Sequence, residues 1–239
     1  MVRRIRERVC GLKPLKRLVY LISPNKINQN FYTSLDKVLS FNNVKFFQLR
    51  LKNVSQKKLI NICKKIKKIT TKNKVNFIIN DDYALSSKVK ADGCHMGQQD
   101  GSFKIARKKL KAKILGITCH NSKVLANQAI GLKADYIAFG SFFKSRLKPS
   151  AKKAMSHNVD YIAFGSFFKS RLKPHAKKAN LNILKWAKKN INKPIVVIGG
   201  INNINYKKLM KAGAKYIALS SFIWDNPKLK PDQAIRKFK

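Results

Sequence analysis

Three polar residues alternate with leucines in the run Gln48-Leu-Arg50-Leu-Lys52. In an extended chain alternate residues share one side, so this pattern would aim an amide, a guanidinium and an ammonium at one point. Such a trio suits an anionic, oxygen-rich group such as pyrophosphate. Alternating polar residues on an edge strand would give the same letters, so the pattern alone is a weak signal.

Carboxylates are scarce in this chain, which has 10 Asp and Glu against 53 Lys and Arg. Asp81 and Asp100 nevertheless follow two successive apolar runs closely. Two carboxylates at neighbouring strand ends can share Mg²⁺, which keeps several waters and takes further ligands from a phosphate. For Asp82 and Asp92 we expect only a capping or turn role.

Small residues follow the last two apolar runs, as Gly199-Gly200 and Ser220-Ser221. The glycines would let the backbone approach a ligand closely, and the serines offer hydroxyl and amide donors. Parallel barrels often bind phosphate at this place. A tight turn is the alternative role for the glycines. Together the motifs predict a site for two phosphorylated ligands and one metal ion.

Short apolar runs alternate with amphipathic stretches along the chain, which predicts eight βα units of the α/β class. We therefore expect a (β/α)8 TIM barrel, although an open doubly wound sheet has the same local pattern. The carboxyl ends of barrel strands meet on one face, where the motifs above would converge. The expected strands are Arg17–Ile22, Val44–Arg50, Val75–Asn80, Gly93–Met96, Lys113–Thr118, Tyr136–Gly140, Ile195–Gly199 and Tyr216–Leu219. The expected helices are Tyr32–Phe41, Ser55–Thr71, Ala84–Lys90, Phe103–Leu110, Ser122–Leu132, Leu181–Asn190, Asn205–Ala212 and Pro231–Phe238.

One segment occurs twice: Asp135–Pro149 recurs letter for letter as Asp160–Pro174, 25 residues later. A solenoid needs several diverged repeats, so a single exact copy indicates a recent tandem duplication or an error in the assembly of the sequence. Because a barrel has a fixed strand number, we expect one copy to lie outside the sheet, as a duplicated insertion of roughly 25 residues around strand six. The first copy is expected to supply strand six. We predict one domain over residues 1–239, with a basic extension at 1–15 and duplicated segments at 135–154 and 160–179.

The net charge of +43 invites a nucleic-acid interpretation, but the lysines are spread along the whole chain. In Lys57–Lys68 they lie between apolar residues at helical spacing, which favours a solvated helix face. No zinc-finger, KH or RNP signature is present, so we expect no specific nucleic-acid partner. No apolar run is long enough to cross a membrane. The four cysteines show no CxxC pair, which favours a reducing compartment, and we expect a cytoplasmic protein.

The ordered set QLRLK, FIINDDYALS, ADGCHMGQQD, LGITCH, IVVIGGI and IALSS resembles the motifs of the thiamine phosphate synthase (thiamine-phosphate pyrophosphorylase) family. The resemblance runs from about Arg17 to Phe238, broken only by the duplication. It implies a (β/α)8 barrel that condenses hydroxymethylpyrimidine diphosphate with a thiazole phosphate, releasing pyrophosphate and giving thiamine monophosphate. It also implies Mg²⁺ as cofactor and small-molecule substrates, and it leaves the oligomeric state open, including a homo-oligomer.

Site residues carry over one by one where this chain matches the family motifs. Asp81 and Asp100 match the Mg²⁺ ligands, and Arg50, Lys52 and Lys148 would neutralise the departing diphosphate. Thr118 stands where the family usually has serine, Ser145 replaces a threonine, and Leu147 stands where a second threonine is expected. His95 and His120 are expected to be structural. The implied substrate-binding residues are Gln48, Arg50, Lys52, Asn80, Thr118, Ser145, Lys148, Gly200, Ser220 and Ser221.

The implied reaction is a dissociative substitution: the diphosphate leaves first, and the thiazole nitrogen then attacks a pyrimidine methyl cation. Two related alternatives are a thiazole tautomerase-like barrel and a catalytically impaired relative, because the duplication falls on the strand-six loop. Lys148 or Lys173 could supply the lysine of that loop. An alternative from another class is a non-catalytic protein that binds polyanions through its charge, which would be indifferent to the loss of Asp81.

Overall fold

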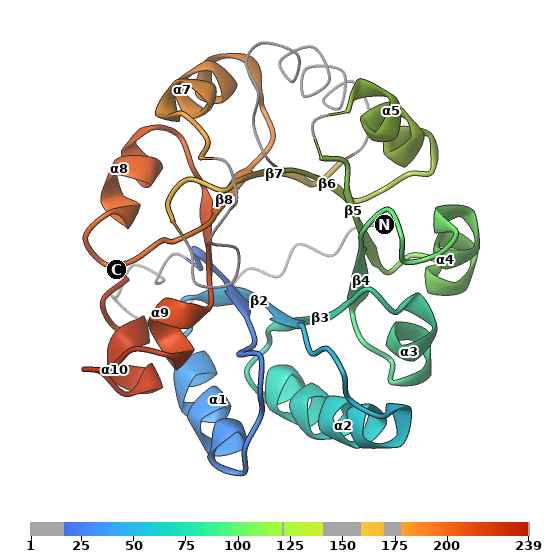
Figure 1. Ribbon diagram of the computed structural model, residues 1–239, viewed down its shortest axis with the longest axis vertical. Coiled ribbons are helices and arrows are strands. Elements are labelled where there is room, and N and C mark those ends of the chain that lie inside the picture. The colour runs from blue at the N-terminus through green and yellow to red at the C-terminus, as the bar shows by residue number, and fades with distance from the viewer. Residues whose placement is uncertain (1–16, 121, 141–158, 170–177, 239) are drawn as a thin grey trace, which may run out of the picture.

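Nine parallel strands form a closed barrel in chain order, with the helices on the outside (Figure 1). The computed structural model describes residues 17–120, 122–140, 159–169 and 178–238. The strands are β1 Val19–Ile22, β2 Val44–Leu49, β3 Asn76–Asn80, β4 Gly93–Met96, β5 Ile114–Thr118, β6 Tyr136–Phe139, β7 Tyr161–Gly165, β8 Ile195–Ile198 and β9 Tyr216–Leu219. The helices are α1 Asn30–Ser40, α2 Gln56–Lys72, α3 Tyr83–Lys88, α4 Phe103–Leu110, α5 Lys123–Gly131, α7 Leu181–Asn190, α8 Tyr206–Lys211, α9 Ser221–Trp224 and α10 Pro231–Ile235.

Both copies of the repeat are barrel strands, as β6 and β7. The parallel α/β barrel is therefore confirmed, but the prediction of eight strands with one copy outside the sheet is wrong. The two strands pair so that Tyr136 lies beside Tyr161 and Phe139 beside Phe164, each residue next to its own copy. Identical strands have the same tendency to pair. When both strands join the sheet, the backbone N–H and C=O groups of both form hydrogen bonds with neighbouring strands. An extruded copy would leave those groups to water.

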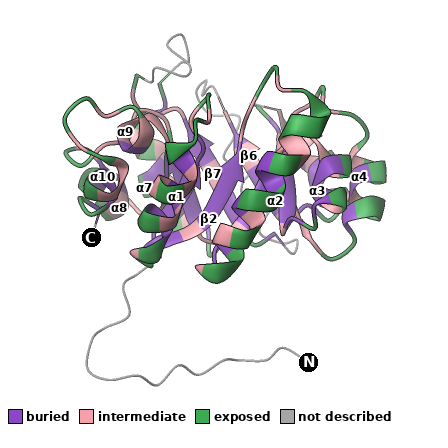
Figure 2. Cartoon of the chain, turned by 90° about the horizontal axis from the view of Figure 1, so that it is seen from below, coloured by how far each residue is buried: buried purple, intermediate pink, exposed green. Residues whose placement is uncertain are grey.

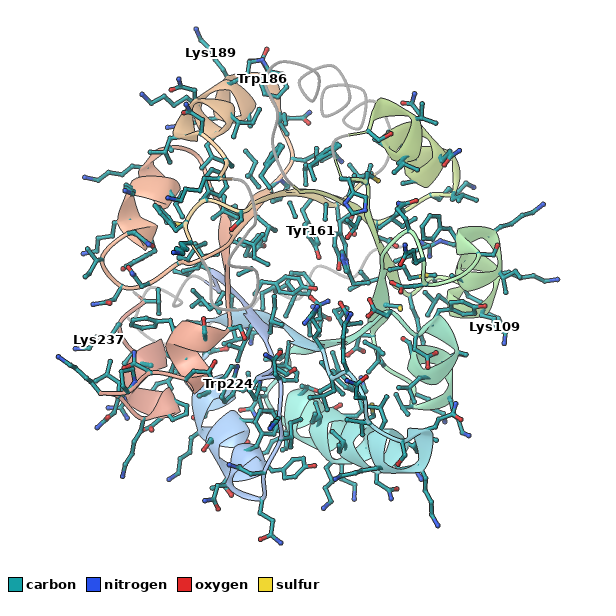
Figure 3. All side chains as sticks on the ribbon, in the orientation of Figure 1. Lys109, Tyr161, Trp186, Lys189, Trp224 and Lys237 are labelled. Carbon is teal, nitrogen blue, oxygen red and sulfur yellow. The ribbon has the colours of Figure 1, made fainter. Side chains whose placement is uncertain are left out.

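The apolar layer between strands and helices forms the larger part of the core. Outward-facing Phe47, Phe77 and Phe164 are fully buried there. Figure 2 shows buried strands enclosed by helices whose outer faces are exposed. In α2 the inner face carries Ile62, Cys63 and Ile66, and most of its lysines lie on the other side, as the sequence predicted. The labelled lysines of Figure 3 also project away from the barrel.

Aromatic rings fill the inside of the barrel. Tyr136 stacks on Tyr161 with centroids 4.3 Å apart, and Tyr161 also contacts Phe46 at 5.6 Å. Figure 3 shows Tyr161 inside the ring of strands. A wider barrel has a larger interior volume to pack. Each copy of the repeat contributes an inward tyrosine side chain that occupies part of this volume. Room for the Tyr136 ring is made by Gly116, where a Cβ atom would lie 1.9 Å from that ring.

Three cysteines, Cys63, Cys94 and Cys119, lie in the described part of the chain, and all are free and buried. Burial raises the pKa of Cys63 and of Cys119 to about 12, so these thiols stay protonated. Cys10 and the expected basic extension at 1–15 lie outside the described residues. Within the described ranges no helix is long and apolar enough to span a membrane.

Replacing Gly116 by alanine is expected to lower the free energy of unfolding by about 1–3 kcal/mol or more, because the new methyl group overlaps the stacked Tyr136 ring. The matched control is Gly131→Ala at the end of α5, where a Cβ meets nothing within 4 Å. That change should raise stability by up to about 1 kcal/mol. Urea unfolding of both variants measures this, and equal stability of the two would contradict the close packing of Tyr136 on β5.

Candidate functional site

Gln48 and Asn80 meet at the carboxyl ends of β2 and β3. Both lie at inward positions, two residues after the interior-facing Phe46 and Ile78. The Gln48 side chain is buried, and its Nε2 donates a hydrogen bond to Asn80 Oδ1 at 2.5 Å. These two predicted site residues are therefore brought together as the strand-end argument requires.

Ser23, which no sequence motif singles out, holds the backbone of the Gln48–Arg50 segment. Its backbone N–H donates to the Gln48 carbonyl at 2.9 Å, and its Oγ accepts from the Arg50 N–H at 2.9 Å. Ser23 is buried just beyond β1. Only the pairing of β1 with β2 places it there. A serine after an apolar run is too common a sequence pattern to have revealed this role.

Asp81 and Asp100 are close enough to interact directly. Burial raises the pKa of Asp81 above its ordinary value, and hydrogen bonding and charge from Asp100 raise it further. Lys52 and Arg50 oppose that shift, so all four charged groups act at one place. The Asp81 backbone is fixed by donation to the His95 carbonyl at 2.7 Å, and Asp100 accepts from Gly97 N–H at 2.6 Å.

This carboxylate pair fits a divalent cation. Two oxygen-bearing side chains with unfavourable mutual charge are what a hard cation neutralises, and Mg²⁺ needs only one or two protein carboxylates. No group of three or more His, Cys, Asp or Glu that could hold a metal occurs in the described ranges. The neighbouring Asp82 and Asp92 have the structural roles predicted for them: Asp82 caps α3 by accepting from Leu85 N–H, and Asp92 accepts from Phe77 N–H and pairs with Lys67.

Thr118, at the end of β5, is linked to the barrel interior. Its Oγ1 lies 2.9 Å from His95 Nε2, while His95 Nδ1 lies 2.8 Å from the Tyr136 hydroxyl. Gln98 Nε2 donates to the Thr118 carbonyl. His95 therefore contacts a predicted substrate-binding residue, and its structural role stays a prediction. An inward tyrosine on the sixth apolar run was the only signal for Tyr136, and many barrel cores carry one.

The Gly199-Gly200 turn follows β8, on the opposite side of the ring from β4 in Figure 1. Both glycines have positive φ, +105° and +59°. A Cβ on Gly199 would collide with Ser166 Oγ at 1.9 Å, and one on Gly200 would lie 2.2 Å from the Lys169 carbonyl. The segment after β7 therefore packs against this turn, so the second copy borders the predicted phosphate site. The first copy supplies β6, the sixth strand of the barrel, as expected.

Ser220 and Ser221 follow β9, as predicted. The Ser220 hydroxyl donates to the Ser23 carbonyl at 3.1 Å, so its hydrogen ties the end of β9 to the end of β1. Ser221 begins the short helix α9, which the sequence did not predict. Ser145 and Lys148, together with Leu147 and Lys173, lie outside the described residues.

The matching family model and the most similar curated relatives name one family. The family model described as thiamine monophosphate synthase matches residues 19–156 and 150–223, two segments that overlap ahead of the second copy of the repeat. The thiamine-phosphate synthase of Pelagibacter ubique is 47% identical over 94% of this chain and 97% of its own length. That of Erythrobacter litoralis is 34% identical over 86% and 87%. In structure the chain is similar to the thiamine phosphate pyrophosphorylase of Pyrococcus furiosus, with a TM-score of 0.66, 22% identity and coverage of 94% of both chains.

Replacing Asp81 by asparagine is expected to raise the melting temperature of the metal-free protein at neutral pH by roughly 2 °C. A carboxyl group with a raised pKa destabilises the fold while it is charged, and asparagine removes the charge and tolerates the φ of +70° at this position. The gain should shrink as pH falls towards 3.8, the ordinary carboxyl pKa, because wild-type Asp81 is then neutral.

Asp82→Asn is the matched control, since asparagine caps α3 as aspartate does and no gain is expected. Differential scanning calorimetry across this pH range measures both variants. A lower melting temperature for Asp81→Asn at neutral pH would show that Asp81 and Asp100 do not repel each other.

Proposed function

The chain belongs to the thiamine monophosphate synthase family, and we propose that it condenses hydroxymethylpyrimidine diphosphate with a thiazole phosphate, giving thiamine monophosphate and pyrophosphate. The observation that carries the proposal is the convergence of Asp81, Asp100, Arg50 and Lys52 at neighbouring strand ends. Two cations beside a carboxylate pair suit a diphosphate bound together with a divalent metal ion.

Asp81 and Asp100 are the residues that would hold Mg²⁺, which supplies charge neutralisation for the diphosphate as its bond to the pyrimidine methyl carbon breaks. Arg50 and Lys52 would bind the departing diphosphate from the β2 side. Their positive charges are already positioned there before the reaction starts. The Gln48–Asn80 pair would orient the pyrimidine, because amide groups offer both a donor and an acceptor to a ring nitrogen and an amino group.

The thiazole phosphate would bind across the barrel mouth, at Gly200 and Ser221. The positive φ of Gly200 favours glycine, and the segment after β7 fills the space where a Cβ would lie, so the turn would meet an anion through its backbone. Because the Ser220 hydroxyl hydrogen is donated to Ser23, its side chain contributes only lone pairs, and Ser221 is the better donor to phosphate oxygen. Ser145 and the strand-six lysine, Lys148 or Lys173, complete the proposed substrate contacts.

The direct test is pyrophosphate release by the purified protein with both substrates, in Mg²⁺ and in chelator. We expect release only with Mg²⁺ and only when both substrates are present. Asp81→Asn should lower turnover at least about 100-fold, since several kcal/mol of charge stabilisation are lost. Asp82→Asn should keep wild-type turnover.

Release that is insensitive to chelator would contradict the metal site. Folded protein without release would contradict the synthase and favour a tautomerase-like or impaired barrel. Salt-sensitive DNA binding that is unchanged in Asp81→Asn, in protein without turnover, would favour the polyanion-binding alternative.

Deletion of residues 135–159 is expected to give a folded eight-stranded barrel with kcat/KM equal to or above that of the full chain. The junction restores Ala134-Asp160-Tyr161, identical to the original Ala134-Asp135-Tyr136, so β7 can pair with β5 in the place of β6. Its contact with β8 and the Gly199-Gly200 turn is unchanged. Circular dichroism and the pyrophosphate assay measure the outcome, and a folded but inactive deletion variant would mean that the ninth strand is needed.

A further inference from the structure

A chain of hydrogen-bonding groups runs from the barrel interior to the strand ends. The hydroxyls of Tyr20 and Tyr136 lie 3.2 Å apart, and the Tyr136 hydroxyl lies 2.8 Å from His95 Nδ1. His95 Nε2 in turn lies 2.9 Å from Thr118 Oγ1. The two tyrosines are buried, at 4% and 2% exposure, so water does not compete for these contacts.

The Tyr136 ring is held on both faces. It stacks on His95 with centroids 5.4 Å apart and 15° between the planes, and on Tyr161 at 4.3 Å and 14°. Gly116 closes the remaining side. Burial raises the pKa of Tyr136 well above its usual value, so its hydroxyl keeps its proton. The hydroxyl is therefore a fixed group that can donate one hydrogen bond.

Tyr161 is the same residue in the same local sequence, one strand further along, and its position in the network differs. Its hydroxyl is buried and lies outside hydrogen-bonding geometry to every described group, although it interacts electrostatically with the hydroxyls of Tyr20 and Tyr136. Tyr136 is on β6, which pairs with β5, and Thr118 is the last residue of β5. Tyr161 is on β7, which pairs with β6 and β8. The duplication thus provides a natural pair in which one tyrosine hydroxyl is hydrogen-bonded to His95, while the other makes no hydrogen bond within the described residues.

The direction of the hydrogens along the chain follows from the ligand expected beside Thr118. An ionised phosphate group has no hydrogen to donate, so Thr118 can bind it only by donating its own hydroxyl hydrogen. Its Oγ1 must then accept from His95 Nε2–H. In the neutral imidazole, hydrogen on Nε2 leaves Nδ1 of His95 unprotonated, and Nδ1 then accepts from the Tyr136 hydroxyl. Tyr136 is then left to accept from Tyr20.

We propose that Tyr136 is a positioning residue for the reaction: by donating to His95 Nδ1 it keeps the hydrogen of the neutral ring on Nε2, and this directs the Thr118 hydroxyl hydrogen towards the diphosphate of the substrate. The inference rests on the proposed function for the identity of that anion. Gln98, which donates to the Thr118 carbonyl, holds the backbone so that only the hydroxyl rotates.

Tyr136→Phe and Tyr161→Phe remove the same atom from the same local sequence. With inorganic pyrophosphate and Mg²⁺ as the probe, titration calorimetry should show binding about tenfold weaker for Tyr136→Phe, the typical effect of one hydrogen bond to a charged group. Tyr161→Phe should bind as wild type does. In turnover, Tyr136→Phe should raise KM for the pyrimidine diphosphate about tenfold with kcat within about twofold. Loss of folded protein would instead lower apparent kcat and leave KM unchanged.

Two further measurements locate the effect. Thr118→Val should weaken pyrophosphate binding, and adding Tyr136→Phe to it should cause no additional loss, because both changes remove one donor. Nitrogen-15 shifts of the His95 ring, assigned by their loss in His95→Gln, should show hydrogen on Nε2 and none on Nδ1 in the wild-type protein. This second measurement needs no variant of Tyr136 to fold.

The inference is overturned if Nδ1 carries the hydrogen, if the two tyrosine variants bind pyrophosphate equally, or if wild-type protein binds no pyrophosphate. Failure of the proposed function has a different signature. Protein that binds pyrophosphate with the predicted loss in Tyr136→Phe, but releases none from the two substrates, would keep the hydrogen-bond chain and discard the synthase.

Discussion

Closure of the parallel sheet is the constraint on which the rest of this structure depends. Every strand must pair on both sides, so a ninth strand is accommodated only if the whole ring widens and its interior is filled. The inward tyrosines of β6 and β7 supply that filler by stacking on each other, with Gly116 making room for the first. Without this stack the wider barrel would enclose a void, which costs free energy in proportion to its size.

The same closure assembles the site. Parallel strands end on one face, so side chains that are far apart in the chain meet there without any direct sequence relationship. Ser23 shows the consequence most clearly, because it links the end of β1 to the backbone of Arg50, just after β2, and accepts through its carbonyl from Ser220 after β9. The charged groups that would neutralise a diphosphate therefore rest on a backbone held by hydrogen bonds from three strand ends.

The duplication separates sequence from environment within a single chain. Asp135 and Asp160 begin identical segments, yet Asp135 pairs with Arg107 and accepts from Leu115 N–H, while burial and the charge of Asp135 raise the pKa of Asp160. Tyr136 joins a hydrogen-bonded chain, while the Tyr161 hydroxyl makes no hydrogen bond within the described ranges. Identical residues thus differ in role solely because the strands beside them differ.

The sequence by itself determined the elements and the polar strand ends. Hydrophobic periodicity is a local property, so it predicted that strands begin at Val44 and at Ile195, and it predicted the lysine-covered helix α2. The positions of polar residues after the apolar runs singled out Gln48, Asn80, Asp81 and Asp100. It could not determine how many strands close the ring, since both copies of the repeat have the same pairing preference and only the packing of the interior chooses between them. It also could not find Ser23 or Tyr136. Ser23 contacts Arg50, 27 positions along the chain, and Tyr136 contacts His95, 41 positions away. Such contacts exist only after the strands have paired.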